Sequence, residues 1–144
     1  MATVSGTRAA TGVPVRGHKG GVLQVAHGSY THASNLAAAT IIEYCRIPKG
    51  AVVVGGFWGS GSALDSADEL VIDVGFDGGA ELGIFDGTAG DGTISHLSFE
   101  DKVEEAGGAF AARSAETVIT ATIDTDAETG GTGTSAVTVY YYVP

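Results

Sequence analysis

The chain has 144 residues, the size of one domain, and a formal net charge of −10. Val, Ile and Thr number 38 against 7 for Leu plus Met, a balance that favours strands over helices. Through Gly50 five basic residues stand against one acidic residue, and beyond it two stand against sixteen. Phosphate binding needs clustered Lys and Arg. The strongly acidic part of the chain after Gly50 therefore excludes nucleic acid and anionic lipid as partners.

Residues 1–20 combine small side chains with cations and show no clear helix or strand period. Such a segment has too little apolar surface to offset its ordering entropy, so we expect an extended N-terminal arm that only a partner surface orders. The charge of the arm is opposite to that of the body, which indicates contact with an acidic surface of a neighbouring subunit or a larger assembly. A tail without a role is the alternative. The cations are Arg8, Arg16 and Lys19.

The next stretch predicts a short strand and then a connection. GVLQVAH at 21–27 is strand-like, with Leu23 and Val25 on one face. Residues 28–39 are polar and rich in Ala, with room for one helical turn. We therefore expect the ordered body to begin at residue 21 and to continue as a single domain to residue 144.

Residues 40–58 are the expected centre of the core. Two β-prone runs, TIIEYCRI and AVVVGGFW, flank the compact break PKG at 48–50. Simple alternation in the first run places apolar and polar residues on both faces. In the second run, the continuous valines at 52–54 predict a strand that is covered on both sides.

The region after Trp58 predicts a loop, a half-buried strand and tight turns. Residues 59–69 are rich in Gly, Ser and Asp, which is typical of a loop. Residues 69–75 alternate, with Leu70, Ile72 and Val74 on one face. Asp-Gly pairs follow, and they favour type I′ turns because both central positions need a positive φ. The pairs are Asp77-Gly78, Asp86-Gly87 and Asp91-Gly92.

The last third predicts further strands. TISHLSF at 93–99 is strand-like, whereas residues 100–113 have a helix-leaning composition that a Gly pair interrupts. Residues 117–123 and 136–143 both alternate, and their proximity predicts that they pair as antiparallel strands. In the second of them, Tyr140 and Tyr142 face opposite to Tyr141, which indicates either an exposed contact ledge or a two-sided core strand.

These elements predict an all-β fold, either an antiparallel β-sandwich or a jelly-roll-like barrel, with the extended N-terminal arm. We expect no membrane segment, because no apolar run approaches the ~20 residues of a span, and no secretion signal. The sequence thus predicts a soluble protein made in a cytosol.

No residue pattern predicts catalysis, a cofactor or a bound metal. Cys45 lies inside a predicted strand, which indicates a buried, inert thiol, and the four His residues lack a metal-binding spacing. DTDAE at 124–128 spaces three carboxylates like the start of a calcium loop, but Thr129 and Ser135 stand where an EF-hand needs Gly and Glu. A cation held by several aspartates is the alternative to ordinary Asp-Gly turn chemistry. Those aspartates are Asp73, Asp77, Asp86 and Asp91.

Four segments carry a resemblance to a known family. They are VRGHKGGVLQV at 15–25, RIPKGA at 46–51, the D-x-x-D-x-L-x-I-D-V-G-x-D pattern at 65–77, and the alternating strand at 136–143. In this order they resemble the small head-decoration, or cement, proteins encoded by tailed bacteriophages. The resemblance spans most of the chain and rests on order and composition, and none of the segments is a catalytic signature.

The resemblance implies a structural virion protein rather than an enzyme. A member of this family is a β-sandwich that binds the outer surface of an assembled capsid, clasping neighbouring major capsid protein subunits, often as a homotrimer. It would be made in the host cytoplasm and act on the virion. In this reading Arg8, Arg16 and Lys19 contact the capsid or a neighbouring copy. The alternative is a carbohydrate-binding or adhesin-like module that uses the acidic loops, with or without calcium.

Overall fold

The computed structural model describes residues 2–5, 22–33, 36–60, 64, 70–86, 94–97, 110–125 and 132–144. Within these residues the chain forms strands, turns and bends, and no helix long and apolar enough to cross a membrane. The strands are β1 (Thr3–Ser5), β2 (Gln24–His32), β3 (Ile41–Ile47), β4 (Val52–Ser60), β5 (Val71–Phe76), β6 (Gly83–Asp86), β7 (Ile94–His96), β8 (Thr117–Thr125) and β9 (Gly133–Tyr142).

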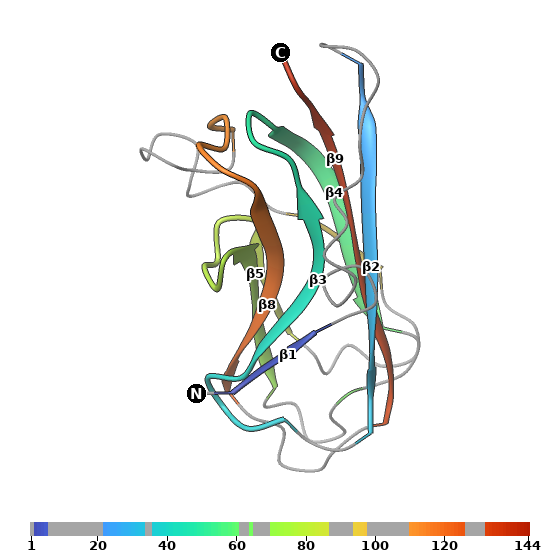
Figure 1. Cartoon of the computed structure of the whole chain (residues 1–144). Helices are drawn as coiled ribbons and strands as arrows, with labels where there is room; N and C mark the ends of the chain where they lie inside the picture. The colour runs from blue at the N-terminus through green and yellow to red at the C-terminus, as the bar shows by residue number, and fades with distance from the viewer. Residues whose placement is uncertain are drawn as a thin grey trace.

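The strands form two sheets that pack face to face. Sheet A has the order β1-β3-β8-β5-β6, and sheet B has the order β2-β9-β4-β7. All neighbouring strands are antiparallel except β1, which runs parallel to β3. Figure 1 shows sheet A on the left and sheet B on the right, with the core between them. The predicted antiparallel β-sandwich is therefore confirmed.

The two runs at the centre of the sequence belong to different sheets. β3 lies in sheet A and β4 in sheet B, so the turn at 48–50 carries the chain across the sandwich. Ala51 N–H donates to the carbonyl of Pro48 across this turn at 3.1 Å. Arg113 holds the crossing in place, because its N–H donates to Ala51 O at 3.0 Å and its carbonyl accepts from Gly50 N–H at 2.7 Å.

A β-bulge in β3 explains why the alternation of this strand is mixed. The pairing with β8 shifts between Glu43 and Cys45, which leaves Tyr44 as the extra residue. Ile42 and Tyr44 are buried before the shift, and Cys45 and Ile47 are buried after it. The extra residue shifts the buried positions from even-numbered to odd-numbered residues. Side chains on both sides of the bulge therefore point into the same core.

The prediction that the valines at 52–54 are covered on both sides is wrong at Val54. Val53 is buried, but Val54 is 40% exposed. The pairing of β4 with β9 shifts between Val53 and Gly55, so Val54 lies at a second bulge. A continuous apolar run indicates burial on both sides only where the ladder is regular.

β2 is longer than the sequence predicts, because it continues through the expected connection to His32. Leu23 lies outside the strand, which begins at Gln24. Leu23 and Val25 are both exposed, and Ala26 is the residue that is buried. Gly28 allows the extension. A Cβ atom at this position would lie 2.0 Å from the carbonyl oxygen of Tyr44 in β3, so only Gly lets the two strands approach.

The prediction that residues 117–123 and 136–143 pair with each other is wrong. β8 lies between β3 and β5 in sheet A, whereas β9 lies between β2 and β4 in sheet B. The chain crosses from one sheet to the other between these two strands. Alternation identifies the buried face of each strand. Because strands of both sheets bury a face in the same core, neither alternation nor proximity in sequence identifies the strand with which each one pairs.

The β5–β6 connection confirms the first Asp-Gly turn. Asp77 and Gly78 have φ values of 50° and 95°, and Gly79 N–H donates to the carbonyl of Phe76 at 2.9 Å. The turn also packs on β8, where Gly78 N–H donates to Thr120 Oγ1 at 2.7 Å. Thr120 is buried for this reason, although it lies on the outer face of sheet A.

The N-terminal arm and the helix-leaning stretch fall largely outside the described residues. Thr3–Ser5 forms β1 on the edge of β3, although the sequence there shows no strand period. Residues 6–21 are not described, so the arm stays a prediction. Of the helix-leaning stretch the structure describes residues 110–113, which form a turn and a bend.

Candidate interaction surface on sheet B

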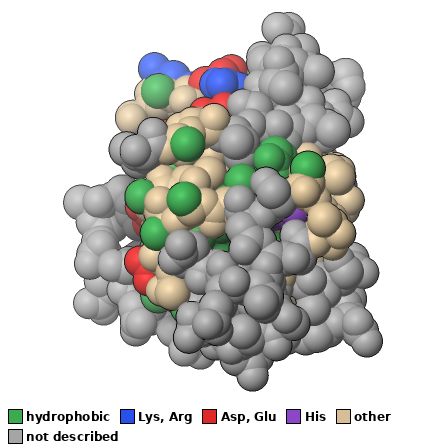
Figure 2. Space-filling view, turned by 90° about the horizontal axis from the view of Figure 1, so that it is seen from below, with side chains coloured by type: hydrophobic (Ala, Val, Ile, Leu, Met, Phe, Trp, Pro, Cys, Tyr) green, Lys and Arg blue, Asp and Glu red, His purple; other side chains and the backbone are tan. Residues whose placement is uncertain are grey.

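Charge is divided unequally between the two sheets. The four strands of sheet B contain no Asp, Glu, Lys or Arg, whereas the strands of sheet A contain five such residues, Glu43, Arg46, Asp73, Asp86 and Asp124. Figure 2 keeps the left and right of Figure 1, and the described charged side chains in it lie in the left half and at the top. The side of sheet B, on the right, shows uncharged side chains and His.

The face of sheet B that points away from the core is the candidate interaction surface. We call it the outer face of sheet B and define it by the exposed or half-buried residues that alternate with the buried ones. They are Val25, His27, Ser29 and Thr31 of β2, Thr134, Ala136, Thr138 and Tyr140 of β9, Phe57 of β4, and Ile94 and His96 of β7.

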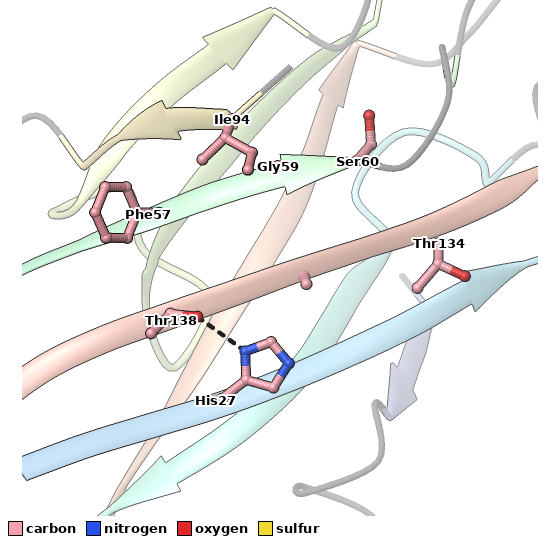
Figure 3. Close-up of a pocket in the computed structure, with 8 residues that line it drawn as sticks. His27, Phe57, Gly59, Ser60, Ile94, Thr134 and Thr138 are labelled. Atoms are coloured by element: carbon pink, nitrogen blue, oxygen red, sulfur yellow. Dashed lines mark hydrogen bonds between the residues drawn. The ribbon is translucent and has the colours of Figure 1, made fainter. Parts of the chain in front are cut away.

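A shallow depression of about 400 Å³ lies in the middle of this face (Figure 3). All three of the long strands contribute to its lining, and Ile94 of β7 closes one side. His27 Nδ1 and Thr138 Oγ1 are 2.8 Å apart across β2 and β9, which orients the imidazole in the lining. Ser60, Thr134 and the ring of Phe57 complete an uncharged, mostly apolar lining.

Aromatic rings form a row across the same face. Phe57 lies opposite His96 of β7, with ring centroids 4.7 Å apart. On its other side Phe57 meets the ring of Tyr140 of β9 edge to face, with centroids 5.8 Å apart. Such cross-strand ring contacts stiffen a sheet and present broad apolar area without charge.

The outer face of sheet B has the composition of a protein contact surface. Ile94 is 71% exposed and Val25 is 45% exposed, although both are apolar. Tyr140 belongs to this face, whereas Tyr141 is fully buried beneath it, so β9 has one core side and one contact side. Interface centres are poor in charged residues and rich in aromatic ones, and this face has both properties.

A second polar cluster lies in the core and links the two sheets. Trp58 Nε1–H of β4 donates to the hydroxyl oxygen of Tyr44 of β3 at 3.3 Å. The Tyr44 hydroxyl lies 2.6 Å from Ser135 Oγ of β9, and Ser135 Oγ lies 2.7 Å from His32 Nε2 of β2. Since indole only donates, a consistent assignment has Tyr44 donating to Ser135 and Ser135 donating to a neutral His32.

Burial fixes the protonation states in this cluster. It lowers the pKa of His32 from 6.5 to about 4, and it raises the pKa of Tyr44 to about 12. His32 and Ser135 have the separation of a base and a nucleophile, but Ser135 is completely buried and no substrate reaches it. The cluster satisfies buried polar groups and holds the sheets in register.

The acidic side chains of sheet A do not assemble a metal site among the residues that the structure describes. Burial, and then the nearby Asp124 carboxylate, raise the pKa of Asp73. Asp77 Oδ1 accepts from Val118 N–H of β8 at 3.0 Å, so this carboxylate bonds the turn to the neighbouring strand. Of the other residues considered for a cation site, Asp91, Asp126 and Glu128 lie outside the described residues.

The partner-binding residues predicted from the sequence are not tested by the structure. Arg8, Arg16 and Lys19 lie outside the described residues. Cys45 is buried and forms no disulfide, as expected. The outer face of sheet B is not predicted by the sequence, except at Tyr140. The available signal was the absence of charge from four strands in a chain of net charge −10.

Comparison with known proteins finds a similar fold in chains of phage capsid structures. No protein-family model and no curated protein matches the sequence. The fold is similar to that of a chain in the capsid of Ralstonia phage GP4, with a TM-score of 0.76 and 20% identity over 99% of both chains. A chain in the cyanophage Pam1 capsid asymmetric unit gives 0.69 and 24%, over 92% of this chain and 93% of that one.

A third similar chain comes from the acidic stable capsid structure of Helicobacter pylori bacteriophage KHP30. Its TM-score is 0.57 and its identity is 14%, over 88% of this chain and 91% of that chain. At these identities the likeness shows the fold. The shared fold covers nearly the whole of each chain.

Proposed function

We propose that the protein is a structural virion protein that decorates and stabilises the capsid of a tailed phage by binding the outer surface of major capsid protein subunits. The observation that carries the proposal is the likeness of fold to a chain of a phage capsid over 99% of both chains. The resemblance in sequence to head-decoration proteins rests on other features, namely short segments in a fixed order, and it supports the same proposal.

The outer face of sheet B is the proposed contact with the capsid. Ile94 and Val25 are exposed in the isolated chain and would lose this exposure against a partner. Complete burial of one such side chain contributes about 1.5–3 kcal/mol. Because the four strands have no charged side chain, docking through this face buries no unpaired charge of its own.

The N-terminal arm is proposed to add an electrostatic contact. Arg8, Arg16 and Lys19 are opposite in charge to the body, where two basic residues stand against sixteen acidic ones beyond Gly50. In this proposal the three cations contact the capsid or the acidic body of a neighbouring copy. The copies associate as a homotrimer, as the family resemblance implies.

Such a protein stabilises the capsid by mass action. A ligand that binds the assembled shell and not its separated subunits adds RT ln(1 + [L]/Kd) to the stability of the assembled state, about 2.7 kcal/mol at a hundredfold excess over Kd. This role requires a contact surface and needs no active site. The completely buried Ser135 beside His32 is compatible with a structural role of this kind.

The test is binding to expanded capsids assembled from the major capsid protein of the phage that encodes the chain. We expect saturable co-sedimentation of the protein with the capsids and a higher melting temperature of the decorated shell. A protein that stays in the supernatant at every concentration, and leaves the melting temperature unchanged, would contradict the proposal.

The contribution of the arm is tested with substitutions that leave β1 intact. Deleting residues 2–20 would also remove the strand that pairs with β3, so we choose Arg8→Gln, Arg16→Gln and Lys19→Gln together. We expect weaker binding at low salt and convergence with the native protein at high salt. Lys49→Gln, at an exposed turn, is the matched control. Equal binding by the triple variant and the control would show that the cations of the arm do not contribute to capsid binding.

A further inference from the structure

Among the residues that the structure describes, the four edge strands of the sandwich differ in length. In sheet A the edge strands β1 and β6 have 3 and 4 residues, and in sheet B the edge strand β7 has 3. The fourth edge strand, β2, has 9 residues. A long edge strand presents a row of unpaired N–H and C=O groups, and proteins usually shorten or block such edges because other chains pair with them.

β2 has none of the features that block an edge. Its sequence, QVAHGSYTH, contains no Lys, no other charged residue and no Pro. Its pairing with β9 runs without a bulge from Gln24↔Tyr141 to His32↔Gly133. The other long strands of sheet B are covered on both sides by neighbours, so β2 is the regular, uncharged edge of an uncharged sheet.

The hydrogen bonds of sheet B identify which backbone groups of β2 face the open edge. Leu97 N–H donates to Gly56 O at 3.1 Å, so Gly56 points its backbone groups toward β7. Phe57, the next residue, therefore points toward β9 and bonds to Thr138, its partner in the register. Val139 then points toward β2 and bonds to Ala26.

By the same alternation, the even-numbered residues of β2 bond to β9 and the odd-numbered ones point their N–H and C=O groups away from it. The structure records no backbone hydrogen bond from the odd-numbered residues to any other described segment. These residues are Val25, His27, Ser29 and Thr31. Their side chains all lie on the outer face of sheet B, so a strand added at this edge would extend the candidate interaction surface without a break.

We propose that the edge of β2, which no other described segment covers, accepts an extended, uncharged segment of a neighbouring capsid protein chain as a fifth strand of sheet B. This proposal rests on the proposed function and deepens it. Main-chain hydrogen bonds would supply the affinity, and side chains opposite Val25 and Thr31 would set the specificity. An uncharged segment fits because a charged side chain would meet only uncharged neighbours at this edge.

The proposed homotrimer argues against a second copy of this chain as the occupant. Pairing β2 with β2 is a two-fold contact that joins two copies, whereas a trimer needs a three-fold arrangement.

The direct test is amide hydrogen exchange, measured on the free protein and on the protein bound to expanded capsids, with the readout by NMR after release. In the free protein we expect fast exchange at Val25, His27, Ser29 and Thr31 and slow exchange at the even-numbered residues of β2. On capsids we expect the four fast amides to slow by at least about a hundredfold.

Each other outcome overturns the proposal in a recognisable way. If the free protein already protects the four amides, the edge is covered by its own chain, or by a second copy if the protection rises with concentration. If the protein binds capsids and the four amides stay fast, the strand addition is wrong while the proposed function stands. If the protein does not bind capsids, both fail.

A pair of substitutions at one position gives an independent readout. Ser29→Pro removes an edge N–H that makes no bond within the sheet, whereas Ser29→Ala keeps the backbone donor. We expect Ser29→Pro to weaken capsid binding about tenfold or more and Ser29→Ala to bind like the native protein. Ser29→Lys serves if the Pro variant does not fold, because a Lys blocks an edge without changing the backbone. Native binding by both Ser29→Pro and Ser29→Lys would overturn the proposal.

Discussion

The two sheets share one core but differ on their outer sides. The strands of sheet A contain charged residues, and the turn at Asp77 and Gly78 packs over part of the outer face, on Thr120 of β8. The strands of sheet B contain none, and the outer face holds exposed apolar and aromatic side chains around a shallow depression. Charged side chains are typical of a face exposed to solvent, whereas an uncharged face with exposed apolar and aromatic side chains has the composition of a contact surface.

The inner sides of the two sheets, in contrast, are in close contact with each other. Gly28 of sheet B lies against the backbone of Tyr44 of sheet A, and the Tyr44 hydroxyl bonds to Ser135 of sheet B. The two sheets are thus in close contact at Tyr44, while their outer sides differ in composition. Substitutions and pH changes can test this division, beginning with the largest expected effect.

Gly28→Ala tests the contact between the sheets. The added Cβ would lie 2.0 Å from Tyr44 O, a backbone atom that cannot turn aside. We expect a loss of about 4 kcal/mol or more in the free energy of unfolding, measured by chemical denaturation. Gly55→Ala is the matched control in sheet B, because its Cβ would meet only Tyr140 Cδ2 at an ordinary 3.7 Å. Equal stability of the two variants would contradict the close approach.

Two exposed isoleucines give a matched test of the outer faces. Ile94 of sheet B is 71% exposed and Ile84 of sheet A is 68% exposed. We expect Ile94→Asp to weaken binding to expanded capsids about a hundredfold, because it buries an unpaired charge at the contact. Ile84→Asp should change the affinity by less than about threefold. The reverse order would place the contact on sheet A.

The pH dependence of stability tests the buried cluster. The unfolded chain takes up a proton on His32 near its ordinary pKa of 6.5, whereas the folded chain does so only near a pKa of about 4. Between these values the unfolded state holds more protons, so stability falls as the pH falls from 6.5 to 4 and this contribution is fully present above 6.5. We expect a loss of about 1–3 kcal/mol.

His32→Gln isolates this contribution, because it keeps a polar side chain and removes the titration. The difference in unfolding free energy between the native protein and the variant should shrink as the pH falls from 6.5 to 4. A difference that stays constant over this range would show that His32 titrates alike in both states.

The ion pair on sheet A should have the smallest effect. Arg46 Nη1 lies 3.2 Å from Glu116 Oε1, with side chains that are 27% and 44% exposed. A double-mutant cycle with Arg46→Gln and Glu116→Gln should give a coupling of about 0.5 kcal/mol that decreases with salt. A coupling above about 2 kcal/mol would mean that the charges of sheet A stabilise the fold.

The sequence predicted the elements that depend on regular alternation and turn chemistry. Ile72 and Val74 are buried on one face of β5, and Asp77 and Gly78 make the expected turn. Alternation failed at Tyr44 and Val54, because a bulge adds one residue and inverts the parity of the rest of the strand. The sequence contains no local signal for such a bulge.

Strand partners and the candidate surface were harder to predict for a different reason. Period-two alternation reports which side of a strand is buried, and it is silent about the neighbour, so β8 and β9 were paired wrongly. The candidate surface depends on strands that are distant in sequence, since Val25 and Ile94 share one face only after folding. The number of charged residues in each strand is the sequence signal that indicates this surface.

A side-chain-resolution image of the capsid carrying this protein tests the central claim most directly. We predict that the outer face of sheet B, with Ile94, Phe57 and His27, lies against the shell and that sheet A faces solvent. An image in which sheet A contacts the shell while Ile94 faces solvent would contradict the account.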